Sequence, residues 1–369
     1  MSSCRSTILV GCLTLAGTCA AFADMSGQQL AQSAGHTLIG APAPALVLKT
    51  IDGKSIDLAS LYGRQAVYLK FWATWCVPCR QQMPHFESTF EHEGPHLAVI
   101  AVNAGFNDTR DDVEAYRRDV GLRMPIVIDD GRLAEVFHLR VTPQHIVIGR
   151  DGRIAYIGHL VDERLESALQ TAQEEPPDAQ TAHQHPQEQH LLQAGTSVPA
   201  LQLTALDGHA LQLADPTQRR ATVVMFISPW CESYLEKSRP QRASACRAAR
   251  EQSERLARAG QLRWVAIASG LWATHEDLTR YRETKHVTIP LALDESGSLF
   301  REFAVKDVPS FIVISATGTL RGRTEEVSDN LGQRLQSLAE DTAAGGTPAG
   351  GTRADGTAAA RTRMRAPSG

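Results

Sequence analysis

The segment Val67–Pro84 reads V-Y-L-K-F-W-A-T-W-C-V-P-C-R-Q-Q-M-P, and the rest of the chain can be interpreted outward from it. It opens with β-branched and aromatic residues, which are typical of a buried strand. A C-x-x-C motif formed by Cys76 and Cys79 follows, and the next residues can start a helix. The N–H groups and the dipole of a helix N-terminus favour an anion, so this position should favour the thiolate of Cys76. We therefore expect Cys76 to attack a disulfide and Cys79 to resolve the mixed product.

A C-x-x-C motif also occurs as half of a zinc site, in which four ligands surround the metal. The chain has no second C-x-x-C motif to complete such a site. A strand, a C-x-x-C motif and a helix, in this order, are instead typical of a redox pair in a thioredoxin-like fold. We therefore favour thiol–disulfide chemistry, with no bound metal and no soluble cofactor.

The run F-W-A-T-W-C-V-P-C-R, with Met83 and Pro84 after it, resembles the TlpA/ResA family of thiol–disulfide oxidoreductases. The resemblance implies disulfide exchange with protein clients. It also implies a reductase that receives its electrons from a membrane thiol reductase and serves cytochrome c maturation or the assembly of metal sites. Such an enzyme requires that a client protein can reach Cys76.

The first 23 residues have the features of a secretory signal peptide. Arg5 precedes a mostly apolar stretch, Ile8–Ala21, and Ala21-Phe22-Ala23 fits an A-x-A cleavage site. The stretch is too short to span a membrane, and glycine and threonine residues interrupt its apolar run. We expect cleavage near Ala23, export to the periplasm and no transmembrane segment in the mature chain. Lipid attachment at Cys12 is an alternative, but few apolar residues precede that cysteine.

Length, charge and cysteine count agree with an exported two-domain protein. A chain of 369 residues can form two domains with separate cores, and the formal net charge of −4 argues against a nucleic-acid partner. Cleavage near Ala23 leaves four cysteines, an even number that suits an oxidising compartment. These are Cys76, Cys79, Cys231 and Cys246.

The chain contains an internal repeat. Ala41–Cys76 and Thr196–Cys231 share a D-G pair between alternating apolar runs and a W-C pair after a strand, at one constant offset. Thr142-Pro143 and Val308-Pro309 each precede a further apolar run. The repeat predicts an α/β protein with two tandem thioredoxin-like domains, each a central mixed sheet flanked by helices. The expected segments are a signal peptide 1–23, a first domain 37–173, a polar linker 174–194, a second domain 195–340 and a disordered tail 341–369.

The two X-Pro pairs are interpreted as cis-proline loops, because both copies carry proline at the same place before a strand. An ordinary trans proline at a strand start is the alternative. The family resemblance implies that the loop with Thr142 and Pro143 faces the C-x-x-C motif and binds the backbone of a client. Trp75 should shape the docking surface beside the thiol, and Pro78 should restrain the redox loop.

Two residues differ from the usual pattern of the family. Lys70 stands where relatives carry an acid or an amide, and Gln82 stands where they often carry a glutamate; the resemblance assigns both positions to proton handling. A lysine beneath Cys79 would favour thiolates and give a more oxidising couple. The other interpretation is that Lys70 extends to solvent and that water takes the proton.

The second copy keeps Cys231 but has Tyr234 in place of the second cysteine. Cys246 lies fifteen residues after Cys231, beyond disulfide reach along one straight helix, although Pro240 could break that helix. A structural disulfide, a second redox couple and two unrelated thiols are all possible. We favour a Cys231–Cys246 disulfide, because an exposed thiol is a liability in an exported protein. Val308 and Pro309 would form the docking loop of this domain.

Two functions of other classes compete with the oxidoreductase. The C-x-x-C motif could hold copper(I) as a pair of soft ligands, helped by His183, His185 and His190 of the linker. Those histidines more often do nothing specific in a flexible polar tract. A non-catalytic client-binding protein, with its main role in the second domain, is the third possibility.

Overall fold

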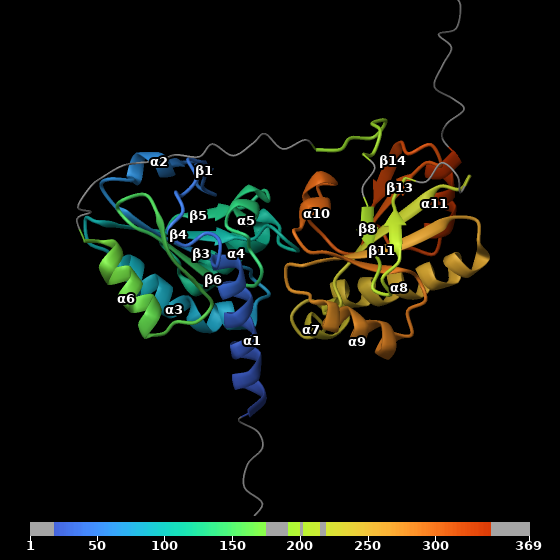
Figure 1. The fold of residues 1–369 in the computed structure, drawn as a ribbon. Coiled ribbons are helices and arrows are strands. Elements are labelled where there is room, and N and C mark those ends of the chain that lie inside the picture. The colour runs from blue at the N-terminus through green and yellow to red at the C-terminus, as the bar shows by residue number, and fades with distance from the viewer. Residues whose placement is uncertain (1–17, 175–190, 200–201, 215–218, 341–369) are drawn as a thin grey trace, which may run out of the picture.

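The computed structural model describes residues 18–174, 191–199, 202–214 and 219–340, which form two α/β units placed side by side (Figure 1). We call residues 18–174 the N-terminal unit and the described residues from 191 to 340 the C-terminal unit. The first part of the predicted signal peptide, most of the predicted linker with its three histidines, and the predicted tail lie outside the described residues.

The N-terminal unit has a five-stranded sheet in the order β5-β4-β3-β6-β7, with a small β1-β2 hairpin beside it. Strands β3, β4 and β5 are parallel, whereas β6 and β7 are antiparallel to their neighbours. The elements are α1 (Thr18–Gly35), β1 (Val47–Lys49), β2 (Ser55–Asp57), α2 (Leu58–Leu61), β3 (Ala66–Trp72), α3 (Val77–Glu91), β4 (Leu97–Asn103), α4 (Arg110–Val120), β5 (Ile126–Ile128), α5 (Arg132–Val136), β6 (Gln144–Ile148), β7 (Ile154–Gly158) and α6 (Glu163–Ala172).

Strand β3 lies at the centre of this sheet, and all seven of its residues are buried. Successive side chains of a strand point to opposite faces, so β3 contributes to two cores. Tyr68 and Trp72 pack on one face with Met83 and Phe86 of α3. The other face packs against α2 and α5. The C-x-x-C motif is therefore held between a fully buried strand and a helix that covers it.

Helix α1 packs against β7, upstream of residue 37, where we expected the first domain to begin. Ala31 and Ala34 are buried, and the Oε1 atom of Gln28 accepts a hydrogen bond of 2.7 Å from the backbone N–H of His159. The packed part of the unit therefore includes residues 27–35, which a cleavage near Ala23 would leave in place.

The C-terminal unit has a second five-stranded sheet, in the order β12-β11-β10-β13-β14, which repeats the order and the strand directions of the first. Its elements are β8 (Gln202–Thr204), β9 (Ala210–Gln212), β10 (Thr222–Ile227), α7 (Cys231–Tyr234), α8 (Pro240–Ala259), β11 (Arg263–Ser269), α9 (His275–Lys285), β12 (Leu291–Asp294), α10 (Ser298–Glu302), β13 (Ser310–Ile314), β14 (Leu320–Thr324) and α11 (Leu331–Glu340).

Strand β10 corresponds to β3 but carries Met225 where β3 carries Lys70. Met225 is opposite Phe311 in the pairing of β10 with β13, as Lys70 is opposite His145 in the pairing of β3 with β6. After β10 the chain forms the single turn α7 and then starts α8 at Pro240, in the first turn of that helix. This break is the one that the position of Pro240 suggested, since proline is tolerated in a first helical turn.

Candidate functional site

Cys76 and Cys79 form a disulfide at the N-terminus of α3 (S–S 2.00 Å, Cα–Cα 5.2 Å). Cys76 is the N-cap residue of this helix, and its Sγ atom accepts a hydrogen bond of 3.2 Å from the backbone N–H of Cys79. Pro78 occupies the first turn, where its fixed φ suits the helix and its missing N–H costs nothing. In the first turn, the backbone N–H of Cys79 thus points toward the sulfur of Cys76.

The loop before β6 faces this disulfide. The Thr142–Pro143 peptide bond is cis, as is Val308–Pro309 in the C-terminal unit. The Sγ atom of Cys76 lies 3.5 Å from the carbonyl oxygen of Thr142. The structure therefore brings together the C-x-x-C motif and the proline loop, which are 66 residues apart in the chain.

Trp75 contacts aromatic residues of the other unit. The centre of its ring lies 5.2 Å from that of Trp272 and 6.3 Å from that of Tyr234, both in the C-terminal unit. Within its own unit, its Nε1–H donates a hydrogen bond of 3.0 Å to the carbonyl of Phe106. We expected Trp75 to belong to a docking surface for clients. In the structure the surface that Trp75 forms is occupied by the C-terminal unit.

The redox cysteines are almost completely covered: Cys76 is 2% exposed and Cys79 is 0% exposed. The hydroxyl of Tyr234 accepts a hydrogen bond of 3.0 Å from the backbone N–H of Val77, and the Nε1–H of Trp272 donates to Oγ1 of Thr142 at 3.0 Å. Cys76, which a client must reach under the sequence-based hypothesis, is thus buried in this arrangement, and residues of the C-terminal unit bind both of the loops beside it.

Lys70 is completely buried under α3, so the interpretation that it extends to solvent is wrong. Its position in the central strand leaves no path to the surface. Within the part of the chain that the structure describes, its Nζ atom has no hydrogen-bond partner and lies 5.3 Å from the centre of the Phe86 ring. Burial in these apolar surroundings lowers the pKa of Lys70 to about 7.

Behind the disulfide, four residues form a hydrogen-bonded chain that ends at the proline loop, in which His159 takes part through both its backbone carbonyl and its side chain. The hydroxyl of Tyr68 is 2.8 Å from Nδ1 of His145, and Nε2 of His145 is 2.9 Å from Oε1 of Gln82. The side-chain amide of Gln82 donates to the carbonyl of His159 at 3.1 Å, and Nδ1 of His159 donates to the carbonyl of Pro143 at 2.7 Å. Gln82 thus links His145 to His159 through two hydrogen bonds.

We did not predict Tyr68, His145 or His159 as parts of the site. The available signal was His145 itself, a polar residue at the start of the apolar run H-I-V-I, because buried polar groups require partners. Burial, followed by the nearby charge of Lys70, holds the pKa of His145 well below its usual range, and burial raises that of Tyr68 well above its own. The imidazole is therefore neutral at physiological pH.

Cys231 and Cys246 also form a disulfide (S–S 1.91 Å, Cα–Cα 6.2 Å). It links α7 to α8 across the break at Pro240, so the interpretation as two unrelated thiols is wrong. The Sγ atom of Cys246 lies 3.8 Å from the carbonyl of Val308, the residue before the cis-proline. Both units therefore place a disulfide against their proline loop.

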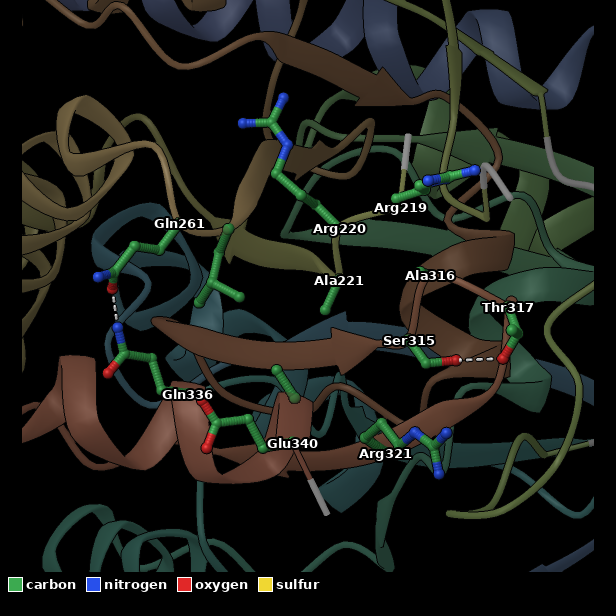
Figure 2. Close-up of a pocket in the computed structure, with 12 residues that line it drawn as sticks. Arg219, Arg220, Ala221, Gln261, Ser315, Ala316, Thr317, Arg321, Gln336 and Glu340 are labelled. Carbon is green, nitrogen blue, oxygen red and sulfur yellow. Dashed lines mark hydrogen bonds between the residues drawn. The ribbon is translucent and has the colours of Figure 1, made fainter. Parts of the chain in front are cut away.

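Two further observations on the described residues concern metal binding and an open pocket. No group of three or more His, Cys, Asp or Glu side chains in the described ranges is arranged to hold a metal ion. An open pocket of about 620 Å³ lies on the C-terminal unit between the start of β10, the end of β13 and α11. Figure 2 shows it lined by arginine, glutamine and hydroxyl side chains, among them Arg220, Arg321 and Gln336, and none of its lining residues is a cysteine.

Comparisons with known proteins identify the class of the protein. Residues 39–157 match the model of the AhpC/TSA family. Thiol-disulfide oxidoreductase ResA of Halalkalibacterium halodurans is 34% identical over 135 residues, which is 36% of this chain and 75% of that protein. The chain belongs to the ResA family of thiol–disulfide oxidoreductases. ResA of Bacillus cereus is 32% identical over 136 residues, 36% of this chain and 77% of the relative. The solved structure of StoA from Bacillus subtilis is 29% identical and covers 34% of this chain and 98% of its own, with a TM-score of 0.31.

The ResA-family match confirms the predicted thioredoxin-like fold of the N-terminal unit and the predicted enzyme class, with Cys76 and Cys79 as the C-x-x-C pair. The two mixed α/β sheets flanked by helices are confirmed as well. The match to the AhpC/TSA model ends at residue 157 and so leaves out the C-terminal unit. In this ResA-family enzyme the redox pair is thus accompanied by a second sheet domain that contacts it.

Proposed function

We propose that the protein is an exported reductase of protein disulfides, with Cys76 as the attacking thiol and Cys79 as the resolving thiol. The observation that carries this assignment is the position of the Cys76 sulfur. It caps the N-terminus of α3, where N–H groups and the helix dipole stabilise a thiolate, and it lies beside the carbonyl of Thr142. Cys79 is fully buried behind it, as suits a thiol that reacts only within the protein.

The reaction begins from the dithiol form. The Cys76 thiolate attacks one sulfur of a client disulfide, and the other client sulfur leaves as a thiolate that takes up a proton. The Cys79 thiol then loses its proton and attacks Cys76, so that the second client sulfur leaves and is protonated. The client gains two electrons and two protons, and the enzyme ends as the Cys76–Cys79 disulfide. A membrane thiol reductase is the proposed source of electrons for the next cycle.

Export to the periplasm, with cleavage near Ala23, is supported by the features of residues 1–23 and by the Cys231–Cys246 disulfide. Structural disulfides persist in oxidising compartments and are rare in the cytosol. No helix in the described ranges is both long and apolar enough to cross a membrane. The family resemblance supports clients of the type found in cytochrome c maturation or in the assembly of metal sites.

We further propose that the C-terminal unit is a second thioredoxin-like domain that has lost its C-x-x-C pair. The repeated strand order, the cis Val308–Pro309 bond and the disulfide beside it support this interpretation. Tyr234 replaces the resolving cysteine, and Met225 replaces the buried lysine. The backbone N–H of Val308 donates to Oδ1 of Asn107 at 3.2 Å, so the proline loop of this unit contacts the N-terminal unit.

The function can be tested with a disulfide reduction assay on insulin and with the redox state of the protein in cells. Reduction of insulin should be lost in Cys76→Ser and retained when Cys231 and Cys246 are both replaced by alanine. Cys79→Ala should accumulate mixed disulfides that identify the clients. A reductase should be recovered from the periplasm with Cys76 and Cys79 reduced; recovery as the disulfide would indicate an oxidase. Stoichiometric copper(I) binding without turnover would contradict both.

A further inference from the structure

The loops that surround the Cys76–Cys79 disulfide are also the loops that contact the C-terminal unit. Tyr234 binds the backbone N–H of Val77, the residue after Cys76. Trp272 binds the side chain of Thr142, whose carbonyl lies 3.5 Å from the Cys76 sulfur. These two hydrogen bonds thus involve the residue that follows Cys76 and the residue whose carbonyl faces its sulfur. A protein client that approached Cys76 would need the same space.

A buried ion pair joins the units close to the redox loop. Nη2 of Arg239 lies 2.7 Å from Oδ1 of Asp108, whose side chain is completely buried. The same carboxylate accepts hydrogen bonds from the backbone N–H and the hydroxyl of Thr74, two residues before Cys76, and from the side chain of Asn103. Arg239 also donates to the hydroxyl of Thr74 at 2.7 Å. The C-terminal unit is thus linked to the polar groups that hold the redox loop.

The contact continues away from the disulfide. Nη2 of Arg301 in α10 lies 3.1 Å from Oε1 of Glu135 in α5, and these two helices face each other in Figure 1. Nη1 of Arg140 donates to the carbonyl of Glu295 at 2.7 Å, and the backbone N–H of Asn107 donates to the carbonyl of Lys306 at 3.0 Å. The interface is therefore composed of specific polar contacts as well as the aromatic cluster around Trp75.

We propose that the client-docking surface of the N-terminal unit is occupied by the enzyme's own C-terminal unit, and that the two units separate before a client reaches Cys76. The second unit thus competes with clients for one surface. The inference depends on the interface and on the enzyme class, and it holds whichever direction the electrons flow and in whichever compartment the protein works.

The composition of the interface is compatible with separation. The N-terminal unit contributes mainly loops to it, around Thr74–Val77, Phe106–Asp108 and Arg140–Thr142. The two cores on either side of β3 consist only of residues of that unit, apart from a peripheral contact by Leu271, whereas Phe106 and Trp75 pack against a core of the C-terminal unit. Polar contacts between domains of one chain resemble transient interfaces, in which relative motion is expected. Separation would therefore expose the redox loop and leave the sheet that supports it intact.

The first experiment measures how fast dithiothreitol reduces Cys76–Cys79 in the full-length protein, with alkylation and mass spectrometry to distinguish the two disulfides. If only separated molecules react, the rate is proportional to their fraction. Glu135→Arg places two arginines at the far edge of the interface and should increase the rate roughly three- to ten-fold. Arg301→Glu should have the same effect, and the double variant, which restores an ion pair, should return the rate toward that of the wild type.

Arg334→Glu is the matched control, since the ion pair of Arg334 with Glu326 lies within the C-terminal unit. It should leave the rate unchanged. Equal rates in all variants, or a double variant that stays as fast as the singles, would overturn the proposal. Because the assay contains no client, a failure of insulin reduction would count against the proposed function and not against this inference.

Hydrogen exchange provides an independent measurement on the same variants. The backbone N–H of Val77 belongs to the first turn of α3, where no helical acceptor exists, and it is bonded to Tyr234. Glu135→Arg should accelerate exchange at Val77 and leave the central residues of β3 protected. Unchanged exchange at Val77, or equal acceleration at Val77 and within β3, would contradict separation of intact units.

Discussion

Lys70 and His145 lie directly opposite each other in the antiparallel pairing of β3 and β6, and both side chains are completely buried. Two groups that can carry a positive charge therefore share one dry site beneath α3. Lys70 and Cys79 belong to the same side of the sheet, since Phe86, over which the Lys70 Nζ lies, packs in one cluster with Cys79. The site should thus affect both the stability of the fold and the chemistry of the disulfide.

Replacing Lys70 with methionine should stabilise the protein at neutral pH, and the gain should shrink as the pH rises. Burial lowers the pKa of Lys70 from 10.5 to about 7, so the unfolded chain binds more protons than the folded one between these values. The stability of the wild type therefore rises with pH in this range. We expect the advantage of Lys70→Met to fall by about 2 kcal/mol between pH 7 and pH 9, as measured by chemical denaturation.

The exposed Lys54→Met is the matched control for this experiment, because it also removes one lysine but leaves the buried site unchanged. A Lys70→Met advantage that is the same at pH 7 and at pH 9 would show that the buried amine does not titrate as described.

The same substitution should make the Cys76–Cys79 couple more reducing. A protonated Lys70 near the sulfurs favours the thiolates of the reduced form, so its removal makes the disulfide harder to reduce. We expect the reduction potential of the couple to fall by roughly 15 to 30 mV, as measured by equilibration with glutathione at pH 7. A tenfold change in the equilibrium constant corresponds to about 30 mV. An unchanged potential would show that the charge of Lys70 does not reach the sulfurs.

Gln82→Glu should destabilise the protein and raise the pKa of His145. One carboxylate oxygen can still accept from Nε2 of His145, and its charge favours the imidazolium. The other oxygen replaces the amide that donates to the carbonyl of His159, which leaves two acceptors facing each other. A loss of about 1 to 3 kcal/mol is expected in chemical denaturation at pH 7, with the His145 titration followed by NMR. Exposed Gln81→Glu is the control, and an equal effect there would contradict the role of the hydrogen-bonded chain.

Replacing both Cys231 and Cys246 with alanine should cost about 3 kcal/mol of unfolding free energy, the value for a disulfide that closes a loop of fifteen residues. Insulin reduction should persist, because the proposed cycle uses only Cys76 and Cys79. The unfolding free energy of the variant is compared, by chemical denaturation, with that of the wild type in which both disulfides are intact. A variant that keeps full stability but loses activity would instead assign a redox role to this disulfide.

The two sheets could be predicted from the sequence because local patterns specify them. The buried run before Cys76, its counterpart before Cys231 and the D-G turns recur at one offset, so each copy supports the interpretation of the other. The proline loops were found by the same comparison, at a slightly larger offset. Even the disulfide of the second unit followed from chemistry, since Pro240 lies where the chain has to turn back.

The interface could not be predicted, because no period or motif connects its members. Val77 and Tyr234 are 157 residues apart, and Thr142 and Trp272 are 130 residues apart. Such pairs depend on how the surfaces of the two folded units fit together, and no local sequence pattern encodes that fit. The burial of Lys70 was also missed as a firm prediction, since a lysine in a strand is usually able to reach solvent. Only the position of β3 at the centre of the sheet, under α3, excludes that path.

Asp108 interacts with both units of the molecule. Its carboxylate accepts a hydrogen bond from Thr74, close to the redox cysteines, and forms an ion pair with Arg239 of the C-terminal unit. Loss of the arginine would leave an acid without its cation inside the protein, and loss of the acid would release both the redox loop and the arginine. We therefore expect a change at either position to be accompanied by a change at the other. Descendants of this chain should keep or discard the two residues together, and the two domains should share a single evolutionary history.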